Sequence, residues 1–332
     1  MRAGREGRRM TGASRRTVWV LSDGKPGMEN QCLGLAEALG RLGAAEAIVK
    51  RISPRFPWSV LPPQLWVAPL AGLNGDALVP PWPDILIATG RQTVAPALAI
   101  KKASAGKTFC VQIQNPVAGR DRFDLLAIPR HDRVDGANVI VTDGALHRIV
   151  PDTLAAEADR LHSVLAALPR PLVAVLIGGS NGQYKMTEAV TAKLAADLSA
   201  LCRDHGAGLA VTASRRTGAV NEKRLRDALD GPACWFWDGT GDNPYFGLLG
   251  LADTIVVTAD SVSMVSEACA TGKPVYVIEL EGGSAKFARF HDHLRDAGIT
   301  RPFDGDLDTW TYTPMDDTAR VAAEAMRRLE RA

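Results

Sequence analysis

A short polar run between two apolar stretches is the first feature of this sequence that suggests chemistry. Residues 258–280 read TADSVSMVSEACATGKPVYVIEL. The apolar stretches Thr254–Val257 and Val275–Ile278, on either side of the polar part, are typical of strands that are buried on both faces. The polar part must therefore face a polar ligand or serve only to cap a helix between the two strands.

Four residues of this run suit the two ends of a nucleotide. Ser261 directly precedes a predicted helix, so its side chain is a candidate N-cap. Ser263 and Met264 lie in the first turn of that helix, where unpaired N–H groups can bind a diphosphate. Glu267 follows inside the helix, where a carboxylate can accept hydrogen bonds from two vicinal ribose hydroxyls. Capping and ligand binding both stay open as interpretations.

Three more loops that follow predicted strands carry suitable residues. Adjacent glycines after the strand Leu172–Ile177 let backbone N–H groups approach a phosphate, and the next loop has an arginine that can bind two phosphate oxygens. The third loop has tryptophans that could flank a base, although tryptophans in a strand are more often core residues. Together the four loops describe a nucleotide-diphosphate pocket. Its predicted residues are Gly178, Gly179, Ser180, Asn181, Ser214, Arg215, Trp237, Asp238, Asn243, Ser261, Ser263, Met264 and Glu267.

Another glycine-bearing loop, SDGKPGMENQ, follows the first predicted strand, Val18–Leu21. Its glycines permit tight turns close to a ligand, so an anion or a sugar could be held there. It is not a Walker loop, because the closing Gly-Lys-Ser/Thr is missing. No Gly-x-Gly-x-x-Gly stands between a strand and a helix, which disfavours a nicotinamide enzyme. The residues of this loop expected to contact a ligand are Gly24, Lys25, Gly27, Asn30 and Gln31.

The elements that must position these loops follow a regular pattern. Short β-branched runs alternate with longer helical ones, which predicts an α/β fold with two Rossmann-like, doubly wound units. Pro169-Arg170-Pro171 ends the predicted helix Leu154–Leu168 and is the candidate boundary. We expect a disordered basic tail over residues 1–16, one unit over 17–168 and a second over 169–312. A helix within 313–332 could dock on either unit, and we expect it to pack back on the first.

Composition excludes several classes of protein. The chain has 332 residues, 46% apolar and 23% charged, as in soluble globular proteins with room for two cores. No run resembles a signal peptide or a membrane-spanning helix, so we expect a cytoplasmic protein. The five cysteines form no Cys-x-x-Cys pair and the six histidines have no metal-ligand spacing, so we expect neither disulfides nor a metal site. The net charge is +2, and we expect no nucleic-acid partner.

Residues 53–83 interrupt the alternation with eight prolines and three tryptophans. So many prolines argue against a central strand. Two interpretations stay open. The segment is either a loop packed by its own aromatic residues or an exposed apolar surface for a lipid-linked acceptor or a membrane.

Long motifs of this chain resemble one family of proteins. The motifs are DGKPGMENQCLGLAEAL, LIGGSNGQY, TASRRTG and WDGTGDNPYFGLLGLADTIVVTADSVSMVSEACATGKPV, within residues 17–330. They are similar to motifs of the bacterial relatives of the plant mitochondrial-fission "elongated mitochondria" (Elm-type) proteins, which are grouped with lipopolysaccharide-core glycosyltransferases. The resemblance implies a GT-B arrangement, in which two Rossmann-like units face a cleft and the second holds the nucleotide sugar. The Gly178–Ser180 and Ser261–Glu267 loops are similar to those that hold UDP-GlcNAc in the peptidoglycan transferase of that fold, where the glutamate meets the ribose.

The same resemblance suggests catalytic and acceptor residues. Relatives commonly have His at the position of Met28, so a base must come from elsewhere in this chain, and the candidates are Glu29, His131 and Asp132. Arg215, the loop amides and the helix dipole would stabilise the departing diphosphate. The acceptor side would combine the loop after the first strand with Arg91, Gln114 and Asn115.

The implied activity is metal-independent and cofactor-free transfer of a sugar from a nucleotide-diphosphate sugar to a cell-envelope acceptor, lipopolysaccharide or another glycolipid. The partners would be the nucleotide sugar and a glycolipid at the inner membrane surface, where the protein would be peripheral. Two alternatives stay open. A sugar-nucleotide epimerase or hydrolase would use the same pocket without an acceptor, and a non-catalytic adaptor of the mitochondrial-fission type would keep the fold without needing the pocket.

Overall fold

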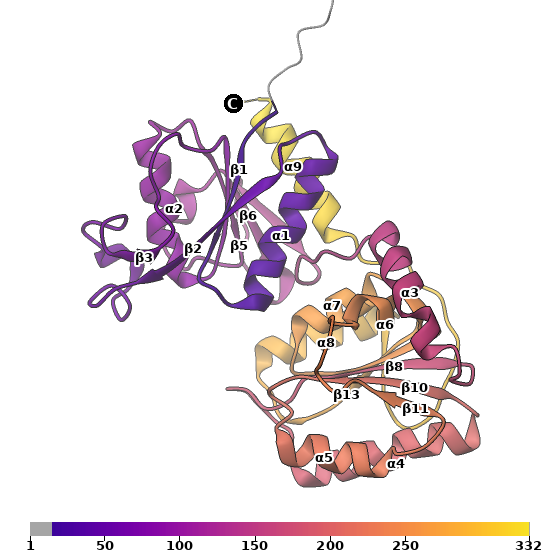
Figure 1. Ribbon diagram of the computed structural model, residues 1–332. Helices are drawn as coiled ribbons and strands as arrows, with labels where there is room; N and C mark the ends of the chain where they lie inside the picture. The colour runs from indigo at the N-terminus through magenta and orange to yellow at the C-terminus, as the bar shows by residue number, and fades with distance from the viewer. Residues whose placement is uncertain (1–14, 332) are drawn as a thin grey trace, which may run out of the picture.

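The structure, a computed structural model that describes residues 15–331, contains two α/β units, here called the N-terminal half and the C-terminal half (Figure 1). In the N-terminal sheet the order is β3-β2-β1-β4-β5-β6-β7, and neighbouring strands are parallel except β2 and β3. The strands are β1 (Val18–Ser22), β2 (Ala47–Pro54), β3 (Leu73–Gly75), β4 (Ile85–Thr89), β5 (Phe109–Ile113), β6 (Leu125–Pro129) and β7 (Val139–Thr142). The helices are α1 (Pro26–Arg41), η1 (Pro63–Leu65), α2 (Arg91–Ala103), η2 (Arg120–Arg122) and η3 (Arg130–Asp132).

The C-terminal sheet is parallel throughout, in the order β11-β10-β8-β12-β13-β15, which is the order of dinucleotide-binding folds. Its strands are β8 (Leu172–Ile177), β10 (Gly208–Ala213), β11 (Cys234–Phe236), β12 (Thr254–Thr258), β13 (Val275–Ile278) and β15 (Thr300–Pro302). The short strands β9 (Tyr184–Lys185) and β14 (Glu281–Gly282) pair beside it. The helices are α3 (Pro151–Leu165), α4 (Glu188–Asp204), α5 (Ala219–Ala228), α6 (Tyr245–Leu251), α7 (Val262–Cys269) and α8 (Ala285–Asp296), and α9 (Asp317–Leu329) follows.

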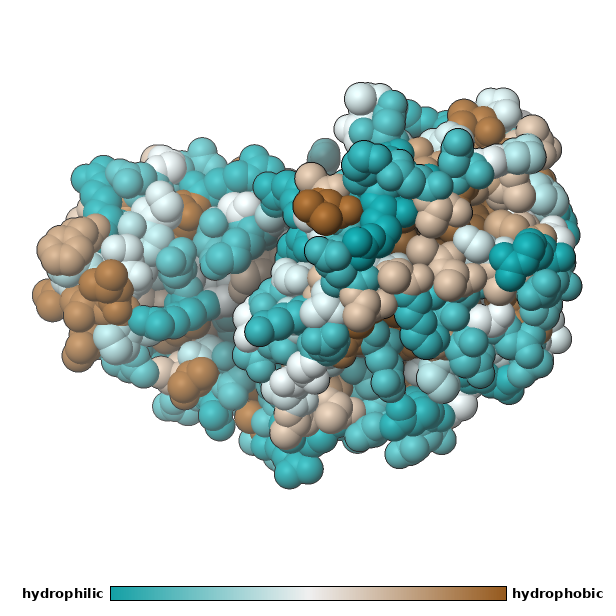
Figure 2. All heavy atoms as spheres, turned by 90° about the horizontal axis from the view of Figure 1, so that it is seen from below, coloured by the Kyte–Doolittle hydropathy of each residue, from teal (hydrophilic) through white to brown (hydrophobic). Residues whose placement is uncertain are grey.

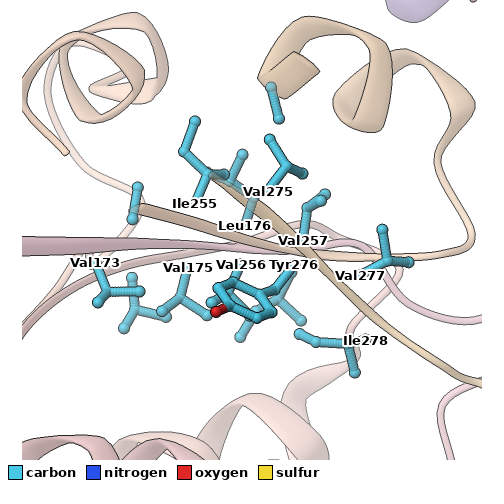
Figure 3. Packing of buried hydrophobic residues seen from close by; sticks show 14 of the residues in the cluster. Val173, Val175, Leu176, Ile255, Val256, Val257, Val275, Tyr276, Val277 and Ile278 are labelled. Atoms are coloured by element: carbon cyan, nitrogen blue, oxygen red, sulfur yellow. The ribbon is translucent and has the colours of Figure 1, made fainter. Parts of the chain in front are cut away.

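The core of the C-terminal half explains why its strands appear in the sequence as continuous apolar runs. Every residue of β8 and β12 is buried, since helices cover both faces of the sheet. Ile255 and Val275 are neighbours on one face, and Val256 and Tyr276 are neighbours on the other (Figure 3). Both faces therefore contribute apolar surface to one core, and each buried square ångström contributes roughly 25 cal/mol.

The chain passes from one half to the other ahead of α3. Leu146 belongs to the core of the N-terminal half, and Ile149 belongs to that of the C-terminal half. The helix α3 packs on α6, although it lies before the boundary expected at residue 169. Prolines end a helix but do not determine on which core that helix packs. Pro169 and Pro171 therefore mark the end of the helix, whereas the chain crosses to the C-terminal half before the helix begins.

The chain returns to the N-terminal half near its end. Met315 packs in the C-terminal core, whereas Val321 of α9 packs in the N-terminal core beside α1 (Figure 1). The two passages are joined by hydrogen bonds, because the backbone N–H of His147 donates to Thr318 Oγ1 at 3.0 Å. Two adjacent segments of the chain, one near His147 and one near Thr318, therefore link the halves.

The first helix begins earlier than its apolar pattern predicts. α1 starts at Pro26, inside the run SDGKPGMENQ that was expected to be a loop, with Lys25 in an extended cap conformation. Proline suits the first helical position, since its missing N–H has no intrahelical partner there. Glu29 and Gln31 consequently lie on a helix and not in a loop.

Residues 53–83 form an ordered flank of the N-terminal half. The edge strand β3 pairs with β2, and the rings of Trp58 and Trp66 pack with centroids 6.2 Å apart. Trp66 Nε1 donates to Leu61 O at 3.2 Å. Trp58 and Trp66 thus pack within the segment, as the first of the two interpretations predicts. Other apolar side chains of the segment, among them Phe56 and Val67, are exposed, so the second interpretation stays open beside it. Over residues 15–331, no helix combines the length and the apolar character needed to cross a bilayer.

Candidate functional site

The carboxyl ends of both sheets open onto one cleft of about 1360 Å³. The strand order changes direction there, between β1 and β4 in one sheet and between β8 and β12 in the other. Ligands of doubly wound folds bind at such points. The volume exceeds the roughly 300–1,000 Å³ of a typical small-molecule pocket, which leaves room for two substrates. The predicted residues that line the cleft are Gly27, Asn30, Gln31, Gln114, His131, Asp132, Asn181, Asn243, Ser261, Ser263, Met264 and Glu267.

Helix α7 begins at the wall of the cleft. Ser261 caps it, because its side-chain oxygen accepts a hydrogen bond from Met264 N at 3.3 Å. Val262 and Ser263 line the cleft, and N–H groups of a first turn have no partner within their own helix. Capping therefore engages the Ser261 hydroxyl, while the positive end of the α7 dipole stays at the cleft.

Glu267 is a buried carboxyl group one turn further along α7. Its side chain lines the cleft, the residue is 8% exposed, and Tyr245 Oη donates to Glu267 Oε2 at 2.7 Å. Burial raises the pKa of Glu267 to about 7, and the hydrogen bond from Tyr245 opposes this rise. Among residues 15–331 no cation pairs with Glu267, so the carboxyl group keeps acceptor capacity toward the cleft.

The loop after β8 packs directly on the loop after β12. A Cβ atom on Gly178 would lie 2.2 Å from Asp260 Oδ1, so only glycine fits at this position. Asp260 is buried, and it accepts hydrogen bonds from Thr258 Oγ1 and from an Arg216 amino group, both at 2.7 Å. Because Gly178 has no side chain, the Asp260 carboxylate fits beside it and bonds the loop after β12 in place.

Most polar groups of the glycine loop bond within the protein. Ser180 N donates to Arg216 O at 3.0 Å, and Ser214 Oγ donates to Gly178 O at 2.6 Å. Gly179 has a φ of +146°, and a Cβ there would lie 2.1 Å from Arg216 O. Gly178, Gly179, Ser180 and Ser214 shape the wall of the site and do not line the cleft, whereas Asn181 lines it.

The arginine that reaches the cleft is Arg216 and not the predicted Arg215. Both arginines are exposed, but only Arg216 forms an ion pair with the buried Asp260, which directs its side chain to the cleft. Sequence spacing alone does not separate two adjacent arginines in a turn, because the choice depends on a carboxylate more than forty residues away.

The predicted base contacts lie outside the cleft. Trp237 Nε1 donates to Thr240 O at 2.8 Å, and Asp238 Oδ1 accepts from Thr240 N at 2.8 Å. Both side chains therefore close the turn that follows β11. Asn243, a few residues later, lines the cleft.

The N-terminal half presents two predicted catalytic residues through η3. Burial, followed by the charge of Lys286, lowers the pKa of His131 to about 4, so its imidazole is neutral at pH 7. The His131 ring packs edge-on against Phe290 of α8, with ring centroids 5.6 Å apart. Asp132 forms an ion pair with Lys286 at 2.6 Å. Both contacts join the halves, because Lys286 and Phe290 belong to α8 of the C-terminal half.

Glu29, the third predicted catalytic residue, lies outside the cleft. Arg51 donates to both of its carboxylate oxygens, at 3.0 and 2.7 Å, and Ser22 Oγ donates at 2.6 Å. The hydrogen bonds from Arg51 are the main cause of the lowered pKa of Glu29, which burial opposes. A carboxylate held in its ionised form in this way is a poor proton acceptor.

The predicted acceptor-side residues divide into two groups. Gln31 and Gln114 line the cleft and meet, with Gln114 Nε2 3.4 Å from Gln31 Oε1. Arg91 instead donates to Leu61 O at 3.2 Å and so binds the flank of residues 53–83. Gly24, Lys25 and Asn115 also lie outside the lining of the cleft.

The cations that line the cleft are all ion-paired. Arg216 pairs with Asp260, and Lys286 pairs with Asp132. Arg148 pairs with Glu37 and Arg160 pairs with Asp242. Within residues 15–331, no three His, Cys, Asp or Glu side chains gather closely enough to bind a metal ion.

Sequence reasoning missed several lining residues. Asp260 stands in the polar run next to Ser261, so the rule that ligands meet strand ends was a usable signal for it. Tyr245 and Lys286 offered no such signal, since each meets the cleft through packing between helices. The missed residues include Arg148, Arg160, Arg216, Tyr245, Asp260 and Lys286.

Comparison with known proteins confirms the sequence resemblance. The model of the family described as Mitochondrial fission ELM1 matches residues 26–329. The mitochondrial fission protein ELM1 of Arabidopsis thaliana is 36% identical over 274 residues, which are 74% of this chain and 64% of the Arabidopsis protein. This chain thus matches less than two thirds of that relative. A Rickettsia prowazekii protein described as uncharacterized is 25% identical over 346 residues, covering 92% of this chain and 96% of that protein.

Solved structures share the fold at low identity. The UDP-GlcNAc 2-epimerase of Methanocaldococcus jannaschii, in complex with UDP-GlcNAc and UDP, has a TM-score of 0.55 and 11% identity over 95% of this chain and 99% of that chain. The S. aureus MnaA structure with UDP has a TM-score of 0.52 and 10% identity over 95% of this chain and 89% of that chain. These likenesses confirm the predicted fold class, two Rossmann-like units facing a cleft in the GT-B arrangement. With its family match and its Arabidopsis relative, this chain belongs to the mitochondrial fission ELM1 family.

Proposed function

We propose that this protein transfers a sugar from a nucleotide-diphosphate sugar to a hydroxyl-bearing acceptor in the cleft. The observation that carries the proposal is the pairing of the start of α7 with the buried Glu267 on one wall of the cleft. A diphosphate needs N–H donors and positive potential, and a ribose needs a hydrogen-bond acceptor for its hydroxyls. Four residues separate Ser263 from Glu267, about 6 Å along a helix axis, which is close to the spacing of these two parts of a nucleotide.

The C-terminal half would hold the donor. Glu267 would accept from the ribose, and the first turn of α7 would bind the diphosphate. The M. jannaschii epimerase that shares the fold was solved with UDP-GlcNAc and UDP, and S. aureus MnaA was solved with UDP, which makes UDP sugars the first donors to test. This assignment gives Gly178 a positioning role, because it lets Asp260 and Arg216 pack beneath the diphosphate.

Transfer forms a bond between the acceptor hydroxyl oxygen and the anomeric carbon. The bond from that carbon to the diphosphate oxygen breaks, and its electron pair leaves with the nucleoside diphosphate. Arg216 and Lys286 line the cleft and would stabilise this charge together with the dipole of α7. Their ion pairs with Asp260 and Asp132 hold both cations in place before the donor arrives.

The acceptor proton would pass to His131. Its imidazole is neutral at pH 7, as a proton acceptor must be. A bound diphosphate would raise the pKa of His131, since a nearby anion stabilises the imidazolium form. Asp132 would act by placing Lys286, because the two groups lie 2.6 Å apart.

The acceptor would enter from the N-terminal side of the cleft. Asn30, Gln31 and Gln114 present amide groups there, which suit the hydroxyls of a sugar. We propose a glycolipid of the cell envelope as the acceptor class, with its sugar part in the cleft.

A turnover assay tests the proposal. The full chain is incubated with UDP-GlcNAc and other nucleotide sugars, with and without a bacterial lipid extract, and the nucleotide, the sugar and the lipid are analysed separately. We expect nucleotide release that depends on the extract, with the sugar recovered in the lipid. A changed sugar still attached to nucleotide, or free sugar formed without the extract, would replace the proposal with epimerisation or hydrolysis.

The adaptor alternative has its own support, because the Arabidopsis relative is named as a fission protein. An adaptor has no need of nucleotide binding. Absence of both nucleotide binding and turnover would therefore favour it.

A further inference from the structure

Exposed apolar residues are concentrated on one flank of the N-terminal half. Within residues 15–331, ten large apolar side chains are strongly exposed, and five of them fall in residues 53–83, under a tenth of the chain. Figure 2 shows apolar surface gathered at the end of the molecule that carries β3 in Figure 1. The apolar flank, as named here, comprises Phe56 (82% exposed), Val60 (65%), Leu65 (57%), Val67 (89%) and Val117 (75%).

The apolar flank is part of a packed segment, so its exposed residues do not belong to a loose loop. The inward side chains Trp58 and Trp66 pack on each other, and Arg91 donates to Leu61 O at 3.2 Å. The segment also packs on α2 through η1. The same stretch therefore keeps its tryptophans partly or fully buried while it turns aliphatic side chains and one phenylalanine to solvent. That distribution costs free energy in water, so it indicates a surface with a partner.

Val117 belongs to the same surface although it lies far from residues 53–83 in sequence. A hollow of about 250 Å³ is lined by Trp66, Val67 and the neighbouring Ala118. Val117 has a φ of +66°, in the left-handed region that β-branched residues rarely adopt. Strain of this kind persists where the surroundings fix the backbone, and it concentrates at functional surfaces. Here it holds an apolar side chain outward next to Ala118, which lines the hollow together with Val67.

The charge around the apolar flank is positive. Residues 53–124 carry seven Lys or Arg and four Asp, a net charge of +3 in a chain whose total is +2. Lys102 and Arg122 line the hollow, and no carboxylate does among the residues that the structure describes. An apolar surface bordered by cations matches an anionic bilayer, whose headgroups attract Lys and Arg while its interface takes up apolar side chains.

We propose that the apolar flank docks on the surface of an anionic lipid bilayer. Phe56, Val60, Leu65, Val67 and Val117 would enter the headgroup region, and Lys102 and Arg122 would meet lipid phosphates. The flank follows the carboxyl end of β2, the edge of the sheet that opens on the cleft. Docking therefore places the cleft near the membrane, but it does not depend on the proposed sugar transfer.

Flotation of the full chain with lipid vesicles tests the proposal. One set of vesicles is phosphatidylcholine alone and the other is equal parts phosphatidylcholine and phosphatidylglycerol, each at low and at high salt. We expect flotation with the anionic vesicles, weakened by salt and reduced at least tenfold in the double variant Phe56→Ser, Val67→Ser. The matched control, Leu42→Ser with Val220→Ser, removes two apolar side chains that are 50% and 67% exposed elsewhere and should float like the parent.

Circular dichroism and thermal melting establish that both double variants fold. Failure of the folded parent to float, or equal flotation of parent and Phe56→Ser, Val67→Ser, would overturn the proposal. A monomer–dimer equilibrium in light scattering that disappears in this variant, without vesicle binding, would also overturn it and would assign the surface to a second copy of the chain. Nucleotide-sugar turnover in detergent is measured in parallel, so failure of docking stays distinct from failure of the proposed function.

Discussion

Two glutamates in the first helices after β1 and β12 hold similar positions and behave in opposite ways. Glu29 on α1 accepts hydrogen bonds from Ser22 Oγ and from two guanidinium nitrogens of Arg51. It lies outside the cleft and has a lowered pKa. Glu267 on α7 has a single hydroxyl partner, Tyr245, faces the cleft and has a pKa raised to about 7. Both halves use a doubly wound fold, but Glu29 is paired with Arg51, whereas no cation among residues 15–331 pairs with Glu267.

The difference shows how one fold is used for two purposes. In the N-terminal half, Met28 packs closely against Gly90 and fills the space after β1. A Cβ atom added to Gly90 would lie 2.2 Å from the terminal methyl carbon of Met28. That half reaches the cleft through η3, which carries His131, and through Gln31 and Gln114. In the C-terminal half the loops after β8 and β12 pack on each other and leave the start of α7 open to the cleft. We therefore propose that the C-terminal half holds the donor and that the N-terminal half contacts the acceptor.

His131 and Glu29 are two of the three N-terminal candidates for the base, and their variants should differ most strongly. His131→Ala should lower kcat for sugar transfer by roughly 10²–10⁴, the usual contribution of a general base, while the Kd for nucleotide stays within about twofold. Glu29→Gln should leave kcat nearly unchanged, because Glu29 lies outside the cleft. Steady-state kinetics with a nucleotide titration measure both. Equal losses in the two variants would remove the distinction between η3 and the loop after β1.

Stability against pH should separate the two glutamates next. Glu267 has an ordinary pKa of 4.5 in the unfolded chain and about 7 in the folded one, so the folded state holds its proton more tightly. The stabilisation is present below pH 4.5 and is lost as the pH rises to 7, on the order of 2–3 kcal/mol. Urea unfolding of the parent and of Glu267→Gln from pH 4.5 to 7.5 should show this slope in the parent only. A parallel slope in both would mean that burial does not shift Glu267.

Adjacent arginines after β10 provide the third test. Arg216→Ala should weaken nucleoside diphosphate binding about 10–50-fold, because it removes a charged donor and leaves the buried Asp260 unpaired. Arg215→Ala should change the Kd by less than about threefold, as expected of an exposed charge. Isothermal titration with UDP gives both constants. The reverse order would show that the ion pair with Asp260 does not select the ligand-binding arginine.

The smallest expected effect is the pH response of Glu29. Its pKa is lowered on folding from an ordinary value of 4.5, so its stabilisation is present above that pH and is lost as the pH falls through the lower folded value. Glu29→Gln should cost at most about 1 kcal/mol at pH 7 and nothing at low pH, because its partner Arg51 is largely exposed to solvent. Unfolding midpoints of the parent and variant at pH 3 and 7 measure this. A variant more stable at pH 7 would contradict the pairing.

Local patterns predicted the fold well because buried parallel strands appear as apolar runs. The runs Leu172–Ile177 and Val275–Ile278 coincide with β8 and β13. The short edge strand β15 was missed, since it has three residues and ends in Pro302. The attachment of α3 to the C-terminal half was also missed, because the side of the boundary on which a helix packs is decided by tertiary contacts and not by a proline signal.

The candidate site was predictable in its loops and not in its side chains. The rule on strand ends placed Ser261, Ser263 and Glu267 at the cleft. It did not indicate that Ser180 and Ser214 bond within the protein, or that Arg51 ties Glu29 away from the cleft. Whether a hydroxyl or charged side chain in a turn bonds within the protein or faces a ligand depends on three-dimensional geometry. Spacing in the sequence does not give that geometry.

The proposed function requires the C-terminal half to bind a nucleotide through Glu267 and the start of α7. Titration of UDP, GDP, CMP, ADP and their common sugar conjugates into the parent chain, Glu267→Ala and Glu29→Gln measures this binding. We predict selective binding of one nucleotide by the parent and by Glu29→Gln, weakened about 10–100-fold in a folded Glu267→Ala variant. Binding that is unchanged in Glu267→Ala, or no binding of any nucleotide by the parent, would contradict it.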